Sequence, residues 1–68
     1  MTNTALLERY IEASGFKKGF IAQQIGLTTY GFSLKVKNKS EFKANEIGIL
    51  CNLLKIGAKD KEAIFFAC

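Results

Sequence analysis

The sequence predicts one compact all-α domain of five short helices, spanning residues 1–68. Apolar residues recur three and four positions apart along most of the chain, which is the spacing of one helix face. No stretch alternates apolar and polar residues for long enough to predict a strand. Hydrophobic residues make up 49% of the chain, as in folded domains. A chain of 68 residues is long enough for one core.

The first helix is expected over residues 4–14. Residues 2–4 are Thr or Asn, which are favourable N-cap residues. Gly15 suits the position that follows a helix, because it adopts the left-handed backbone without strain. Phe16 is then an apolar residue in the connection, and we expect its ring to fill the core.

Residues 18–37 carry the pattern of two helices joined by a tight turn. The small side chain of Ala22 suits a point where two steeply crossing helices touch. Gly26, four residues later, can take the positive φ that a sharp turn needs. Phe32 then ties the second helix, expected over about 29–37, to the core. This spacing predicts a helix-turn-helix motif.

The second helix of the motif has an inner and an outer side. Thr28 is a suitable N-cap for it. Phe32 and Val36 share one edge of the helical wheel and are expected to anchor it to the core. Leu34 is then left pointing outward. Residues 38–41, Asn-Lys-Ser-Glu, predict a turn after the helix.

The C-terminal part predicts two more helices. Phe42 is a second apolar residue in a connection and is expected to fill the core. A helix over about 44–55 follows, and we expect Gly57 to stop it. A final helix, capped by Asp60, is expected to run through about residue 66.

The composition argues against catalysis and metal binding. The chain has no His, so the usual general base and the commonest metal ligand are missing. Glu8 and Glu12 have helical spacing, but nothing nearby would raise either pKa, and a solvated face explains them better. Cys51 fits a small core side chain, and Cys68 is expected to be exposed. We therefore expect no enzymatic activity, metal, cofactor or small-molecule substrate.

Targeting signals are also missing. No apolar run approaches the ~20 residues of a membrane span. The first residues, Met-Thr-Asn-Thr, do not begin a signal peptide. Two cysteines in 68 residues do not suggest a disulfide-stabilised domain, so the reducing cytoplasm is the expected location.

The net charge of +4 is unevenly distributed. Residues 13–43 contain six lysines and one acidic residue, Glu41, whereas the flanking segments are nearly neutral. The lysines are Lys17, Lys18, Lys35, Lys37, Lys39 and Lys43. Such a block indicates a polyanionic partner, either nucleic acid or an anionic membrane. A membrane-surface binder needs a basic amphipathic helix, whereas these lysines lie mostly at predicted helix ends and turns.

Residues 16–42, FKKGFIAQQIGLTTYGFSLKVKNKSEF, resemble the helix-turn-helix of small Cro-like phage repressors of the lambda-repressor-like superfamily. The most specific parts are FIA…IGLT, at residues 20–28, and NKSEF, at residues 38–42. The resemblance extends more loosely over the other predicted helices. It implies a five-helix domain that binds operator DNA, usually as a dimer, and switches phage promoters in a bacterial host, at the nucleoid. The family often has Arg or Gln where this chain has Thr29, Tyr30 and Leu34.

A helix-turn-helix places its second helix in the major groove, so the side chains near that helix divide into two sets. The predicted base contacts are Thr29, Tyr30, Ser33 and Leu34. The predicted phosphate contacts are Lys18, Thr28, Lys37, Asn38, Lys39 and Ser40. Lys35 lies off the outward face and is a weaker candidate.

Half-sites one helical turn apart require two copies of the chain. We expect a weak homodimer through the last helix, with Ile64, Phe65 and Phe66 at the interface and Cys68 near the two-fold axis. The alternative is a protein-interaction module of the same fold, an antitoxin or anti-repressor, that binds through an apolar groove around Leu34 and Ile49.

Overall fold

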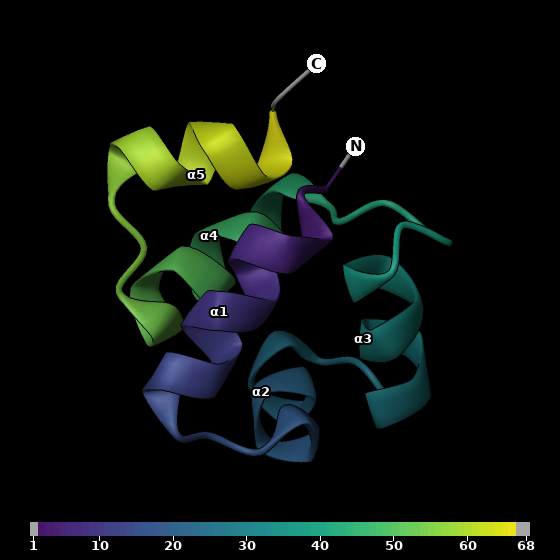
Figure 1. Ribbon diagram of the computed structural model, residues 1–68. Helices are drawn as coiled ribbons and strands as arrows, with labels where there is room; N and C mark the ends of the chain where they lie inside the picture. The colour runs from purple at the N-terminus through teal and green to yellow at the C-terminus, as the bar shows by residue number, and fades with distance from the viewer. Residues whose placement is uncertain (1, 67–68) are drawn as a thin grey trace.

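The computed structural model describes residues 2–66, and this part of the chain is all-helical, without a strand (Figure 1). The five helices are α1 (Thr4–Ser14), α2 (Lys18–Ile25), α3 (Thr29–Val36), α4 (Ala44–Leu54) and α5 (Ala58–Phe65). The predicted all-α, five-helix fold is confirmed. The expected starts and ends of the first four helices agree with the structure to within one residue.

Helix α1 is central to the packing. It contacts α3, α4 and α5, while α2 packs against α3 and α4. In Figure 1, α5 lies at the top and α3 at the right-hand edge, so α1 and α4 separate them. Helix α3 therefore keeps one long side free of the other four helices.

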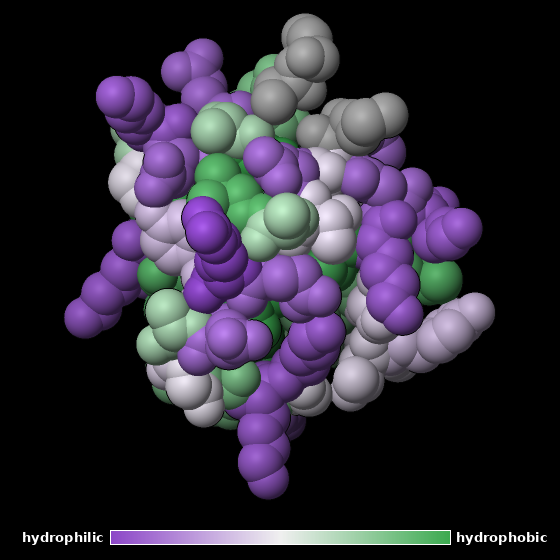
Figure 2. All heavy atoms as spheres, in the orientation of Figure 1, coloured by the Kyte–Doolittle hydropathy of each residue, from purple (hydrophilic) through white to green (hydrophobic). Residues whose placement is uncertain are grey.

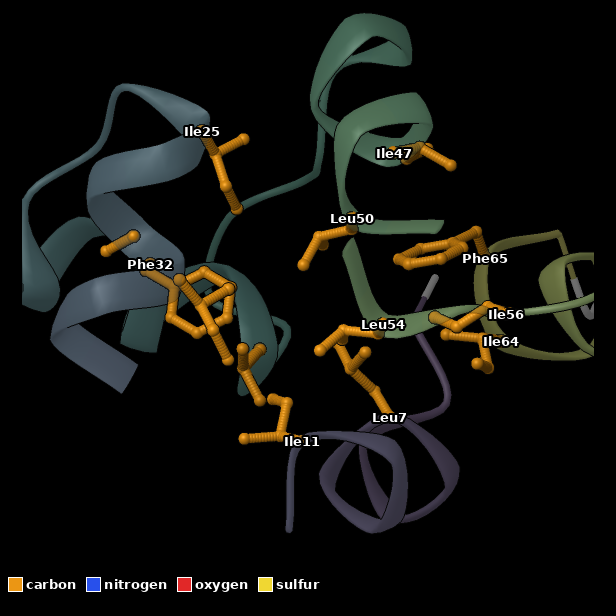
Figure 3. Close-up of a cluster of buried hydrophobic side chains, with 13 residues drawn as sticks. Leu7, Ile11, Ile25, Phe32, Ile47, Leu50, Leu54, Ile56, Ile64 and Phe65 are labelled. Carbon is orange, nitrogen blue, oxygen red and sulfur yellow. The ribbon is translucent and has the colours of Figure 1, made fainter. Parts of the chain in front are cut away.

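All five helices contribute to a single apolar core (Figure 3). The buried side chains are Leu7, Ile11, Ile21, Ala22, Ile25, Phe32, Val36, Ile47, Leu50, Leu54, Ile56, Ile64 and Phe65. Phe42 contacts two of them edge to face, with ring centroids 6.1 Å from Phe32 and 5.5 Å from Phe65. Each such pair adds about 1 kcal/mol beyond the burial of its area. The expected placement of Phe42 in the core is confirmed.

Phe16 does not fill the core as expected. Its side chain is exposed and lies against Phe20, with ring centroids 5.1 Å apart. The nearest buried residues in the sequence are Ile11 and Ile21. The ring of Phe16 instead covers another exposed ring.

The connection between α4 and α5 also differs from the prediction. Helix α4 ends at Leu54, and the residue that stops it is Lys55, with a left-handed φ of 56°, and not Gly57. The next residue, Ile56, is buried, and its N–H donates to the Cys51 carbonyl (2.9 Å). The chain therefore reverses early enough to bury Ile56. Gly57 precedes α5 instead, and Asp60, expected as a cap, lies inside α5 and accepts a hydrogen bond from the Tyr10 hydroxyl.

Candidate nucleic-acid interface

The turn between α2 and α3 is built from the backbone. Gly26 has a φ of 82°. Its N–H donates to the Gln23 carbonyl (3.1 Å), and the Leu27 N–H donates to the Ala22 carbonyl (2.9 Å). This is the Schellman arrangement, in which a left-handed residue ends a helix and pairs its last carbonyls. Ala22 is fully buried. The two helices and the turn therefore form as the residue pattern predicted.

Helix α3 begins with a side-chain cap. Thr28 Oγ1 accepts a hydrogen bond from the Gly31 N–H (3.0 Å), which leaves the hydroxyl proton of Thr28 able to donate to another group. A Cβ on Gly31 would lie 3.1 Å from that oxygen, so the missing side chain makes room for the cap. A Cβ on Gly19 would lie 3.4 Å from Thr29 Oγ1. The beginnings of α2 and α3 are therefore neighbours.

The predicted base-contact residues lie on the first two turns of α3 and differ in exposure. Tyr30 is 74% exposed, the largest value among the exposed large apolar side chains, and Thr29 is also exposed. Ser33 and Leu34 are half-buried, so Leu34 points outward only in part. In Figure 2 pale side chains of intermediate hydropathy gather at the lower right, over the beginning of α3. This end of α3 presents a polar surface with one prominent ring.

Most of the predicted phosphate contacts are accessible at the two ends of α3. Lys37, Lys39 and Ser40 are exposed just after the helix. At the other end, the Lys18 ammonium lies 3.2 Å from a carboxylate oxygen of Glu8. Both side chains of that pair are about two-fifths exposed, and exposed pairs contribute little to stability. Lys18 can therefore exchange Glu8 for another anion.

One lysine of the basic block, Lys35, is not available to a partner. Its ammonium lies 2.6 Å from Glu46 Oε1, and the two side chains are only 11% and 6% exposed. Glu46 also accepts a hydrogen bond from the Lys43 N–H (2.8 Å) at the start of α4. Burial raises the pKa of Glu46, but these two hydrogen bonds and the nearby lysine charges outweigh burial, and its pKa is lowered. Glu46 was not among the predicted residues, although an acid at the third position of a helix is typical of such a capping bond.

Asn38 was predicted as a phosphate contact, but in the structure its side-chain amide is engaged within the chain. Its Oδ1 accepts from the Thr2 N–H (2.7 Å), and its Nδ2 donates to the Thr2 carbonyl (2.5 Å) and to Thr4 Oγ1 (3.4 Å). The amide therefore binds the beginning of the chain. It has no donor left for a phosphate without giving up one of these bonds.

Two of the three predicted dimer residues, Ile64 and Phe65, are also corrected by the structure. Ile64 is fully buried and Phe65 is 7% exposed, so neither is available on the surface of the chain. They pack in the core because the apolar face of α5 lies against α1. Phe66 is 57% exposed. The prediction for Cys68 lies outside the described residues.

Cys51 is half-buried and packs against the core, and burial raises the pKa of its thiol.

Across residues 2–66, no three His, Cys, Asp or Glu side chains gather as a metal site would require. Within the same range, none of the helices combines the length and the apolar character needed to cross a membrane. In comparisons with protein-family models, curated proteins and solved structures, the chain has no match.

Proposed function

We propose that this chain binds double-stranded DNA through α3 and acts as an operator-binding repressor of the Cro-like type that its sequence resembles. One observation carries the proposal. The free side of α3 presents Thr29 and Tyr30, and exposed lysines flank both ends of that helix. A helix of this width fits the major groove, and lysines at both ends can neutralise phosphates on the two sides of that groove.

The side chains divide between base edges and phosphates. Thr29 and Tyr30 reach base edges first, and Ser33 and the exposed edge of Leu34 follow, the latter suited to a thymine methyl. The phosphate contacts are Lys18, Thr28, Lys37, Lys39 and Ser40, with the N–H groups at the start of α3 adding to the attraction for anions. Lys17 and Lys43 are exposed and extend the basic surface. Asn38 is left out because its amide is engaged.

A single helix-turn-helix reads few base pairs, so we propose a homodimer on a two-half-site operator, in the cytoplasm and at the nucleoid of a bacterial host. With Ile64 and Phe65 buried, Phe66 is the one predicted interface residue that is exposed among those described. The dimer surface is therefore small, and the dimer is expected to be weak and to be tightened by DNA.

The experiment is a titration of the chain against duplex DNA, including the DNA that flanks its own gene, at several salt concentrations. About four lysine–phosphate contacts per chain predict that log K falls with log salt at a slope of about −3.5 per bound chain. Lys39→Ala should weaken all duplexes alike and reduce the slope by about one, whereas Leu34→Ala should change the preferred sequence. A slope near zero contradicts DNA binding.

The second candidate is a protein-interaction module, an antitoxin or anti-repressor. The exposed rings of Phe16 and Phe20, which lie against each other, favour it, because a contiguous exposed apolar patch is typical of a docking surface. Binding to a protein through such residues survives high salt. The salt titration therefore separates the two candidates.

A further inference from the structure

We propose that Asn38 is a positioning residue: through the segment Thr2–Thr4 it fixes the turn that presents Lys37 and Lys39. This inference rests on the proposed function, since it assigns those two lysines to phosphates. The proposal concerns the shape of the turn in the free protein. It places no direct contact between Asn38 and DNA.

The turn after α3 has the same backbone form as the turn after α2. The Asn38 N–H donates to the Lys35 carbonyl (3.2 Å), and the Lys39 N–H donates to the Leu34 carbonyl (2.8 Å). Asn38 occupies the left-handed position, with a φ of 64°. Glycine is the usual residue there, because any Cβ introduces strain. Asn tolerates this position better than other residues with a side chain, and a further interaction can offset the strain that remains.

The side-chain amide of Asn38 supplies that interaction. It forms a reciprocal pair with the backbone of Thr2, as acceptor of the N–H and as donor to the carbonyl. A second link runs in parallel, since the Thr4 hydroxyl donates to the Val36 carbonyl (2.6 Å) in the last turn of α3. Thr2 and Thr4 of the N-terminal segment thus hold Asn38 and Val36, one after α3 and one in its last turn.

The N-terminal segment is itself anchored. The Asn3 N–H donates to the Ile64 carbonyl of α5 (2.6 Å), and the side chain of Thr2 is buried. Asn38 therefore bonds to a fixed support. Position 38 lies between the two exposed lysines, so holding it sets where both lysine side chains begin. A turn that had to be ordered during binding would lower the affinity.

The first test compares Asn38→Gly with Lys39→Ala. Glycine keeps the left-handed turn and removes only the amide, so the variant should bind duplex DNA about tenfold more weakly, from the cost of ordering the turn. Its salt slope should stay that of the wild type, because the same lysines reach the same phosphates. Lys39→Ala should instead reduce the slope by about one. In the free protein, Asn38→Gly should speed hydrogen exchange of the Lys39 amide.

The second test separates positioning from direct contact. Thr4→Val removes the hydroxyl bond to the Val36 carbonyl and the weaker bond from the Asn38 amide, without touching any proposed DNA contact. It should weaken binding as Asn38→Gly does, Thr4→Ser should restore it, and the combined variant should be no weaker than Asn38→Gly alone. Tyr10→Phe is the matched control, since it removes the tertiary hydrogen bond to Asp60 and leaves the turn intact. Its affinity should equal that of the wild type.

Three results would overturn parts of this account. Wild-type affinity for Asn38→Gly in a chain that binds DNA refutes the positioning role alone. Weak binding of Asn38→Gly with wild-type binding of Thr4→Val assigns Asn38 to direct contact and also refutes it. A wild-type chain that binds no duplex refutes the proposed function, and the inference falls with it.

Discussion

The turns before and after α3 share a backbone form but are held by different means. The turn at residues 26–28 uses Gly26 for the left-handed position and the Thr28 side chain as a cap, all within a few residues of one another. The turn at residues 37–40 uses Asn38, whose amide partners lie 36 and 34 positions away in the sequence. The first turn is held by local contacts alone, whereas the second adds contacts with the distant N-terminal segment to its local backbone bonds.

The largest effect is expected from breaking the ion pair between Lys35, in the last turn of α3, and Glu46. Glu46→Ala leaves the Lys35 ammonium buried without its partner, so the free energy of unfolding should fall by about 3–5 kcal/mol. Urea denaturation followed by circular dichroism measures it. Glu12→Ala, on the exposed side of α1, is the control and should change stability by no more than about 0.5 kcal/mol. Equal effects of the two variants would contradict the importance of the buried pair.

Exchanging the two left-handed residues tests the comparison directly. Asn38→Gly relieves backbone strain but loses the amide bonds, and a net loss of about 1–2 kcal/mol is expected. Gly26→Asn should cost less than about 1 kcal/mol, because Asn tolerates the left-handed region and a Cβ there has open space around it. Both are measured as shifts of the urea midpoint. A larger loss of stability for Gly26→Asn than for Asn38→Gly would mean that both turns are held by local effects alone.

Acid should weaken the far end of α3 selectively. The pKa of Glu46 lies below its ordinary value of 4.5, so the ionised carboxylate stabilises the fold. That contribution is fully present above 4.5 and is lost as the pH falls through the folded-state pKa. Glu46→Gln should lack this part of the pH dependence. The check is unfolding free energy from pH 7 down to about pH 2 for both proteins.

The smallest effect on stability is expected at Tyr30, near the locally encoded turn. Tyr30→Ala removes an exposed ring and should change the free energy of unfolding by less than about 0.5 kcal/mol. The preferred duplex sequence should nevertheless change, as measured by competition between duplexes. Tyr30→Phe tells whether the ring or the hydroxyl matters. A large loss of stability would show that the ring supports the fold.

Most of the predictions that the structure confirms depend on neighbours in the sequence. Helical spacing, Gly26 and Thr28 are local features, and they suffice to predict where α2, the turn and α3 lie. The placement of Asn38 could not be predicted, because its partner, the backbone of Thr2, is distant in the sequence. Every residue has the same backbone groups, so no residue type indicates such a partner. Lys35 was predicted to be off the outward face, but its pairing with Glu46 requires the packing of α3 against the start of α4.

The errors over apolar residues have a similar origin. Helical spacing tells which residues share a face, but not whether that face meets the core of its own chain or another protein. Ile64 and Phe65 complete the core, whereas Phe16, expected inside, lies on the surface. In a domain of this size the core has room for a limited number of rings. Which rings it admits depends on the three-dimensional arrangement of all five helices.

The bond between Asn3 and Ile64 has a consequence for synthesis of the chain. A nascent chain whose residues 4–36 have left the ribosome contains the helix-turn-helix. It still lacks residue 64, whose carbonyl holds the N-terminal segment. Asn3 acquires its partner when residue 64 emerges, and Thr2 can then hold Asn38. The turn that carries Lys37 and Lys39 should therefore reach its final form only after residue 64 has emerged. A chain truncated before α5 should lack the contact that anchors the N-terminal segment, even where α1, α2 and α3 have formed.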